Sequence, residues 1–128
     1  MCDQESKTSV KDENPFSNKC KANLGLLQKA HRTLAKDVQE LRSMLSQYKA
    51  KKGLTDQHMS NRDKIADGLV SFAPLLEEAG DMIEELKLMP DNEDQEVAEP
   101  MAVKSGTFLS GLQAYLDATK QMKKECKP

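Results

Sequence analysis

Apolar residues recur every three or four positions over a long stretch near the start of the chain. Together with a few semi-apolar residues, they occupy Cys20, Leu24, Leu27, His31, Leu34, Val38, Leu41, Leu45 and Tyr48. Steps that alternate between four and three residues place a stripe along one side of an α-helix, as in coiled-coil heptads. With Ser17 as a cap and Gly53 as a left-handed stop, the pattern predicts a helix over residues 18–52.

Two later stretches have the same spacing. The first contains Ile65, Leu69, Phe72, Leu76, Ala79, Ile83 and Leu86 and predicts a helix over residues 56–88. The second contains Phe108, Leu112, Tyr115, Thr119, Met122 and Cys126 and predicts a helix over residues 101–125, with Pro100 in its first turn. Pro74 interrupts the middle helix on the side away from its stripe, where we expect a kink with the proline facing solvent.

The segments outside these helices are polar. Residues 90–100 carry five acids and a proline at each end, which predicts an exposed acidic loop. Residues 1–16 are polar and predict a disordered tail. Because long helices joined by short turns pack antiparallel, the prediction for residues 17–128 is an all-α, up-down-up antiparallel three-helix bundle with coiled-coil-like helices. Cys20 and Cys126 would then lie at opposite ends of the bundle.

Charge is distributed in blocks, although the net charge is only −2. Residues 18–52 carry a net charge of +7 and residues 53–89 carry −5. The basic block has no interleaved aromatic residues, so we interpret it as a helix beside an acidic neighbour and expect no nucleic-acid partner. No apolar run approaches the ~20 residues that cross a bilayer. The chain also starts without a secretory pattern, so we expect a cytoplasmic protein without an integral membrane segment.

Catalytic and metal-binding signatures are missing from the sequence. It contains none of the usual phosphate-binding, dinucleotide-binding, hydrolase or zinc-protease motifs. Its three cysteines, Cys2, Cys20 and Cys126, do not have the spacing of a zinc site or of a disulfide framework. We therefore expect no enzyme activity, no catalytic residues, no cofactor and no bound metal.

The stripe of the first helix is the main candidate for binding a partner. That helix is predicted to be longer than the third, so part of its stripe would be covered by one neighbour only. The candidate contact residues are Leu24, Leu27, His31 and Leu34. His31 either acts as a pH-sensitive switch or a ligand, or has a structural role, in which it sets the register of the helix pair or is partly exposed where the third helix leaves a gap. The partner would be a second copy, giving a homodimer, or another helical subunit.

One short motif lies in the predicted tail. The tripeptide Asn14-Pro15-Phe16 resembles the ligand of EH domains, which occur in endocytic and recycling proteins. The resemblance implies a tight turn at Asn14 and Pro15 and a Phe16 side chain that enters an apolar pocket. It implies an EH-domain protein as a partner and a role in membrane traffic. The alternative is that Asn14 starts an ordinary turn and Phe16 staples the first helix.

Two stretches are similar to helices of BAG domains. They are Leu112-Gln113-Ala114-Tyr115-Leu116 and Leu75-Leu76-Glu77-Glu78. The resemblance implies a cofactor of a chaperone, although the basic cluster of BAG domains is missing because residues 105–111 are uncharged. The leading interpretation is a non-enzymatic interaction module, an adaptor or a subunit of a larger coiled-coil assembly. A BAG-like cofactor and a small carrier of an apolar ligand are the alternatives.

Overall fold

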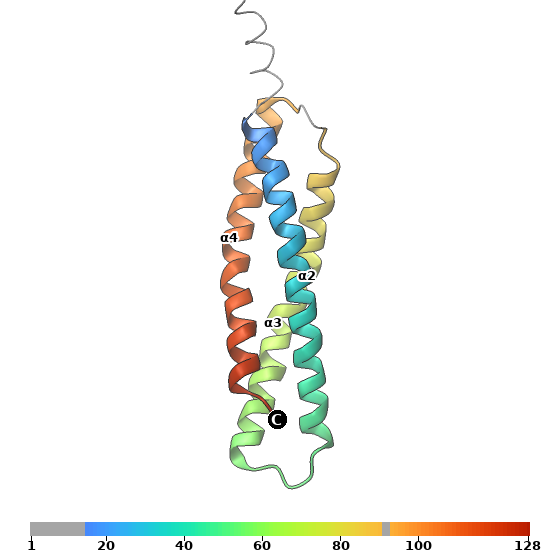
Figure 1. The fold of residues 1–128 in the computed structure, drawn as a ribbon, viewed down its shortest axis with the longest axis vertical. Coiled ribbons are helices and arrows are strands. Elements are labelled where there is room, and N and C mark those ends of the chain that lie inside the picture. The colour runs from blue at the N-terminus through green and yellow to red at the C-terminus, as the bar shows by residue number, and fades with distance from the viewer. Residues whose placement is uncertain (1–14, 91–92) are drawn as a thin grey trace, which may run out of the picture.

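The protein folds as three long helices joined by two short connections. The computed structural model describes residues 15–90 and 93–128. In chain order the helices are α2 (Pro15–Ala50), α3 (Asp56–Lys87) and α4 (Gln95–Glu125). α2 and α4 run in the same direction and α3 runs antiparallel to both, which confirms the up-down-up three-helix bundle (Figure 1). Among the described residues, no helix combines the length and the apolarity needed to cross a membrane.

The first helix begins earlier than the sequence predicts. Pro15 and Phe16 were assigned to a disordered tail, but both are helical. Proline suits the first turn because its missing N–H would have no partner there. Ser17 is consequently not the cap, and its hydroxyl contacts the carbonyl oxygen of Glu93 at 3.3 Å. The rest of the predicted tail, residues 1–14, lies outside the described residues.

The connection between α2 and α3 contains the predicted glycine stop and a capping box. Gly53 adopts a left-handed φ of +66°, which glycine tolerates without strain. Thr55 is the N-cap of α3, and its hydroxyl accepts a hydrogen bond from the His58 backbone N–H at 3.1 Å. The Nδ1 atom of His58 in turn accepts the Thr55 backbone N–H at 3.4 Å, so this capping box fixes where α3 starts.

The last helix also begins before its predicted start. α4 starts at Gln95, so residues 95–100 belong to the helix and not to an acidic loop over residues 90–100. Asp94 is the N-cap and Glu96 lies in the first turn, where negative charge is favoured by the helix dipole. Pro100 is exposed inside the helix and not in its first turn. Acids and prolines indicate a loop by composition, but acids are favoured near a helix N-terminus. Pro100 lies beyond the first turn, where it removes one backbone hydrogen bond and the helix nevertheless continues.

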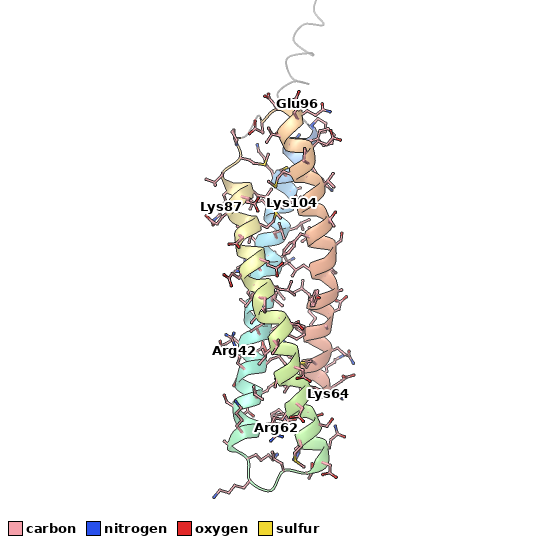
Figure 2. The ribbon with its side chains drawn as sticks, turned by 180° about the vertical axis from the view of Figure 1, so that it is seen from behind. Arg42, Arg62, Lys64, Lys87, Glu96 and Lys104 are labelled. Carbon is pink, nitrogen blue, oxygen red and sulfur yellow. The ribbon has the colours of Figure 1, made fainter. Side chains whose placement is uncertain are left out.

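The helix α2 lies at the centre of the fold. It packs against α3 and α4 along most of its length, whereas α3 and α4 contact each other much less. Figure 1 shows α3 and α4 on either side of α2 in the upper half of the bundle. Seen from behind, α3 crosses in front of α2, and Lys104 of α4 pairs with Glu85 of α3 at 3.1 Å (Figure 2). Pro74 is exposed in the middle of α3, as predicted.

Candidate functional site

The interface between α2 and α4 is built from two matching stripes. The buried stripe of α2 is Cys20, Asn23, Leu27, Ala30, Leu34, Asp37, Leu41, Met44 and Tyr48. Four of these residues hydrogen-bond to α4 or to the residues after it, namely Cys20, Asn23, Asp37 and Tyr48. The buried stripe of α4 is Ala98, Ala102, Ser105, Leu112, Leu116, Thr119 and Cys126. The α2 stripe steps by three and four residues, and the α4 stripe has the same spacing with two steps of seven. The two helices therefore pack in parallel like a coiled coil.

The stripe of α2 is offset by one residue from the predicted one at several positions. Asn23, Ala30 and Met44 are buried, whereas Leu24 and His31 are only half-buried. Asn23 and Asp37 are polar, so an apolar pattern passes over them. Leu24 lies beside Leu86 of α3 and His31 beside Gly80 of α3, and the predicted stripe therefore mixes residues from two different interfaces.

Hydrogen bonds join the polar members of the two stripes. The side-chain amide of Asn23 donates to the Ser105 hydroxyl at 2.9 Å and to the Ala102 carbonyl oxygen at 3.3 Å. Gly106 of α4 lies beside this amide, and a Cβ atom there would meet the Asn23 amide nitrogen at 3.6 Å, an ordinary contact distance. Among the described residues, no buried side-chain nitrogen or oxygen lacks a hydrogen-bond partner.

A charged cluster lies further along the same interface. The carboxylate of Asp37, which is only 4% exposed, accepts hydrogen bonds from the Thr119 hydroxyl at 2.9 Å and from the Lys123 ammonium at 2.7 Å. The same ammonium lies 3.2 Å from the Glu40 carboxylate. The hydrogen bond to Asp37 is the main reason that the pKa of Lys123 is raised above its ordinary value.

A groove runs along the outer side of this interface. Its upper part has a volume of about 540 Å³ and is lined by Phe16, Lys19, Asn23, Leu26, Ala102, Val103, Gly106, Thr107, Leu109 and Ser110. Its middle part is lined by Leu26, Lys29, Ala30, Thr33, Leu109, Gln113, Leu116 and Lys120. Leu26 and Leu109 line both parts, so the two hollows adjoin along the helices. We call this groove the α2/α4 groove.

The lower part of the α2/α4 groove is rich in lysine. It has a volume of about 760 Å³ and is lined by Glu40, Met44, Asp117, Lys120, Gln121, Lys123, Lys124, Lys127 and Pro128. Lys120 connects it to the middle part. Among the described residues, no ion pair involves Lys29, Lys120, Lys124 or Lys127. The groove therefore combines an apolar floor with a positively charged rim.

The residues predicted to bind a partner lie in different places. Leu27 and Leu34 are fully buried between helices, so a partner cannot reach them while the bundle is closed. Leu24 and His31 are half-buried on the α3 side of α2. None of these four residues lines the α2/α4 groove.

The EH-ligand tripeptide is divided by the start of α2. Asn14 lies outside the described residues, Pro15 is exposed, and Phe16 is half-buried against the core. Phe16 also lines the upper end of the α2/α4 groove. Its side chain could enter a pocket on another protein only if the first turn of α2 unwinds.

The sequence-based prediction does not include several of the groove residues. Leu26 and Val103 are large apolar residues that are 53% and 62% exposed. Both lie outside the predicted stripes, and such off-stripe apolar residues are the signal that could have indicated this surface.

Metal-binding side chains and reactive thiols are the other groups to consider among the described residues. Among residues 15–90 and 93–128, no cluster of three or more His, Cys, Asp or Glu residues is placed to hold a metal ion. The thiols of Cys20 and Cys126 are buried at opposite ends of the α2–α4 pair, and burial raises the pKa of both. Buried thiols of raised pKa are poor nucleophiles at neutral pH.

No protein-family model matches the chain, and no curated protein or solved structure is significantly similar to it. The physical properties of the surface are therefore the basis for assigning a function.

Proposed function

We propose that this protein is a non-enzymatic interaction module that binds a helix of a partner protein in the α2/α4 groove. The observation that carries the proposal is the exposed apolar floor. Leu26 of α2 and Val103 of α4 are both more than half exposed, and the half-buried Leu109 of α4 lines the same hollow. Contiguous exposed apolar surface with a polar rim is typical of interaction sites.

A helix is the occupant that the shape favours. The groove lies between two parallel helices of 36 and 31 residues, and these pack side by side over nearly their full length (Figure 1). A third helix laid between them would bury its apolar stripe in the manner of a four-helix bundle. This supports an adaptor or a subunit of a helical assembly, as the sequence predicts.

The alternatives have less support from the described surface. A carrier of an apolar ligand would need an enclosed apolar cavity, whereas the hollows between α2 and α4 open to solvent and are bordered by lysines. The EH-ligand interpretation needs Phe16 to leave its position against the core. A cytoplasmic location and a role in membrane traffic remain predictions from the sequence.

The proposal can be tested by site-specific photo-cross-linking in extracts of the native source. A photo-reactive residue at Val103 should capture a discrete partner, and Leu26→Glu in the same chain should abolish that capture. The matched control places the photo-reactive residue at Val70 of α3, which is exposed to 75% and lies away from the groove. Equal capture from Val70, or capture from Val103 that survives Leu26→Glu, would refute a groove-bound partner.

A further inference from the structure

We infer that the helix bound in the α2/α4 groove is acidic, with carboxylates flanking its apolar stripe. This inference rests on the proposed function and adds the chemistry of the partner. Its starting observation is that four lysines border the groove without an ion pair among the described residues. They are Lys29, Lys120, Lys124 and Lys127.

Lys123 differs from these four lysines, because it forms ion pairs within the chain. Lys123 is 24% exposed, and its ammonium is neutralised by Asp37 and Glu40, which are the only acids of α2. The fold thus supplies both carboxylates of α2 to a single lysine. The remaining rim lysines face the groove mouth, where Asp117 is the other acid in the lining. Complementary rim charges steer association and select among partners.

A second copy of the chain fits this groove poorly. Two such grooves placed face to face would bring their lysine rims together, which like-charge repulsion disfavours. The outer side of α3 does carry exposed acids, including Asp67, Glu77 and Asp81. The large apolar residues exposed on α3 are Met59 and Val70, and Leu88 follows just beyond its end. These residues are widely separated along the helix, so they do not form the continuous apolar stripe that would fill the floor. The observations therefore favour another protein over the predicted homodimer.

A phosphate backbone or a lipid surface also fits less well than an acidic helix. The lysines do not form a continuous basic face, because apolar side chains such as Leu26, Leu109 and Met44 lie between them on the floor. A helix with a leucine stripe and glutamate borders matches both components at once. Phosphate ligands would use the rim and leave the floor in contact with water.

The test uses the whole chain and two synthetic helical peptides with the same leucine and alanine stripe. One peptide carries glutamate at the flanking positions and the other carries lysine. Fluorescence anisotropy at low salt should give at least about tenfold tighter binding for the glutamate peptide. This preference should shrink as the salt concentration rises, because rim charges are screened.

Charge-reversal variants identify the lysines responsible. Lys120→Glu combined with Lys124→Glu should reverse the preference, so that the lysine peptide binds more tightly. The matched control is Arg42→Glu with Lys49→Glu. It changes the net charge of the chain by the same amount, on exposed residues of α2 that do not line the groove. This control should keep the original preference for the glutamate peptide. Neither Arg42 nor Lys49 is among the residues that line the groove, and Arg42 is labelled in the view from behind in Figure 2.

The outcomes separate the inference from the proposed function. Equal affinity for the two peptides, or no binding of either, would overturn the acidic partner, while photo-cross-linking from Val103 would still decide whether the groove is occupied. Duplex DNA or phosphatidylserine vesicles serve as competitors. If either displaces the glutamate peptide and loses binding with Lys120→Glu and Lys124→Glu, the rim is a phosphate site and the inference is wrong.

Discussion

The hydroxyl of Tyr48 donates a hydrogen bond to the backbone carbonyl oxygen of Cys126 across 2.7 Å. The carbonyl oxygen of Lys127 lies 2.9 Å from the same hydroxyl. From α3, the side-chain amide of Asn61 donates to the Tyr48 oxygen at 3.2 Å. One fully buried phenol therefore connects the C-terminal ends of α2 and α4 to the first turns of α3.

Removing this hydroxyl should destabilise the bundle. We expect Tyr48→Phe to lower the free energy of unfolding by about 1–3 kcal/mol, because the buried amide of Asn61 and the carbonyl oxygens near Cys126 lose a partner. Urea unfolding measures the difference. Tyr115→Phe is the control, since Tyr115 is 40% exposed and should change stability by less than ~0.5 kcal/mol. Equal effects of the two variants would contradict this role for Tyr48.

The buried carboxylate of Asp37 depends on Lys123 for its counter-charge. Lys123→Met should lower the free energy of unfolding by about 2–4 kcal/mol, because it leaves an almost fully buried charge with only the Thr119 hydroxyl and solvent. Adding Asp37→Asn removes that charge, so the double variant should lose less stability than the sum of the single variants. Chemical denaturation of the four proteins forms a double-mutant cycle, and strict additivity would argue against coupling.

Stability should also fall at alkaline pH. Its hydrogen bond to Asp37 raises the pKa of Lys123 above the ordinary 10.5, and burial raises the pKa of Cys20 and Cys126 above the ordinary 9.0. The folded chain therefore holds these protons more tightly than the unfolded chain does. The associated stability is present below those ordinary values and is lost as the pH rises through the raised ones.

Urea unfolding between about pH 8 and about pH 11 tests this dependence. Replacing both Cys20 and Cys126 by alanine should reduce the loss that begins near the ordinary thiol pKa of 9.0. Lys123→Met should reduce the loss at the upper end of the range. A free energy of unfolding that stays constant or increases with pH would be inconsistent with the raised pKa values.

The sequence predicted the bundle well because its evidence is local and repetitive. Alternating steps of three and four residues define each helix, and glycine and threonine mark the turn at Gly53 and Thr55. The apolar pattern also located the centre of the core, including Leu27, Leu34 and Leu41, which are fully buried. Short connections then leave little choice of topology.

The groove could not be predicted in the same way, since it depends on how two distant helices are aligned. The register between α2 and α4 is fixed by polar pairs such as Asn23 with Ser105 and Asp37 with Thr119. A pattern of apolar residues does not detect such pairs. Only with this alignment do Leu26 and Val103 line one groove. The start of α4 at Gln95 was also missed, because the acidic composition of this segment is typical of a loop.

Two glycines inside helices provide a matched test of the packing. A Cβ atom on Gly25 would meet nothing within 4 Å, whereas one on Gly68 would lie 2.8 Å from the terminal methyl of Met122 and 3.0 Å from the Phe72 ring. Gly25→Ala should raise the free energy of unfolding by about 0.5–1 kcal/mol, the usual gain in helix propensity. Gly68→Ala should give no gain or a loss of about 1–2 kcal/mol, because crowding beside the buried Phe72 ring offsets that gain.

The cause of the difference can be isolated at Met122. The flexible end of the Met122 side chain accounts for the closest contact of a Cβ atom added at Gly68. Met122→Ala therefore removes most of this crowding, although it also loses the packing contacts of the Met122 side chain. Against that background, Gly68→Ala should be less harmful than in the unmodified chain, whereas Gly25→Ala should have the same effect in both backgrounds. Thermal unfolding of the single and double variants measures both couplings. If Gly68→Ala stabilises the unmodified chain as much as Gly25→Ala does, α3 and α4 are not in contact at this point.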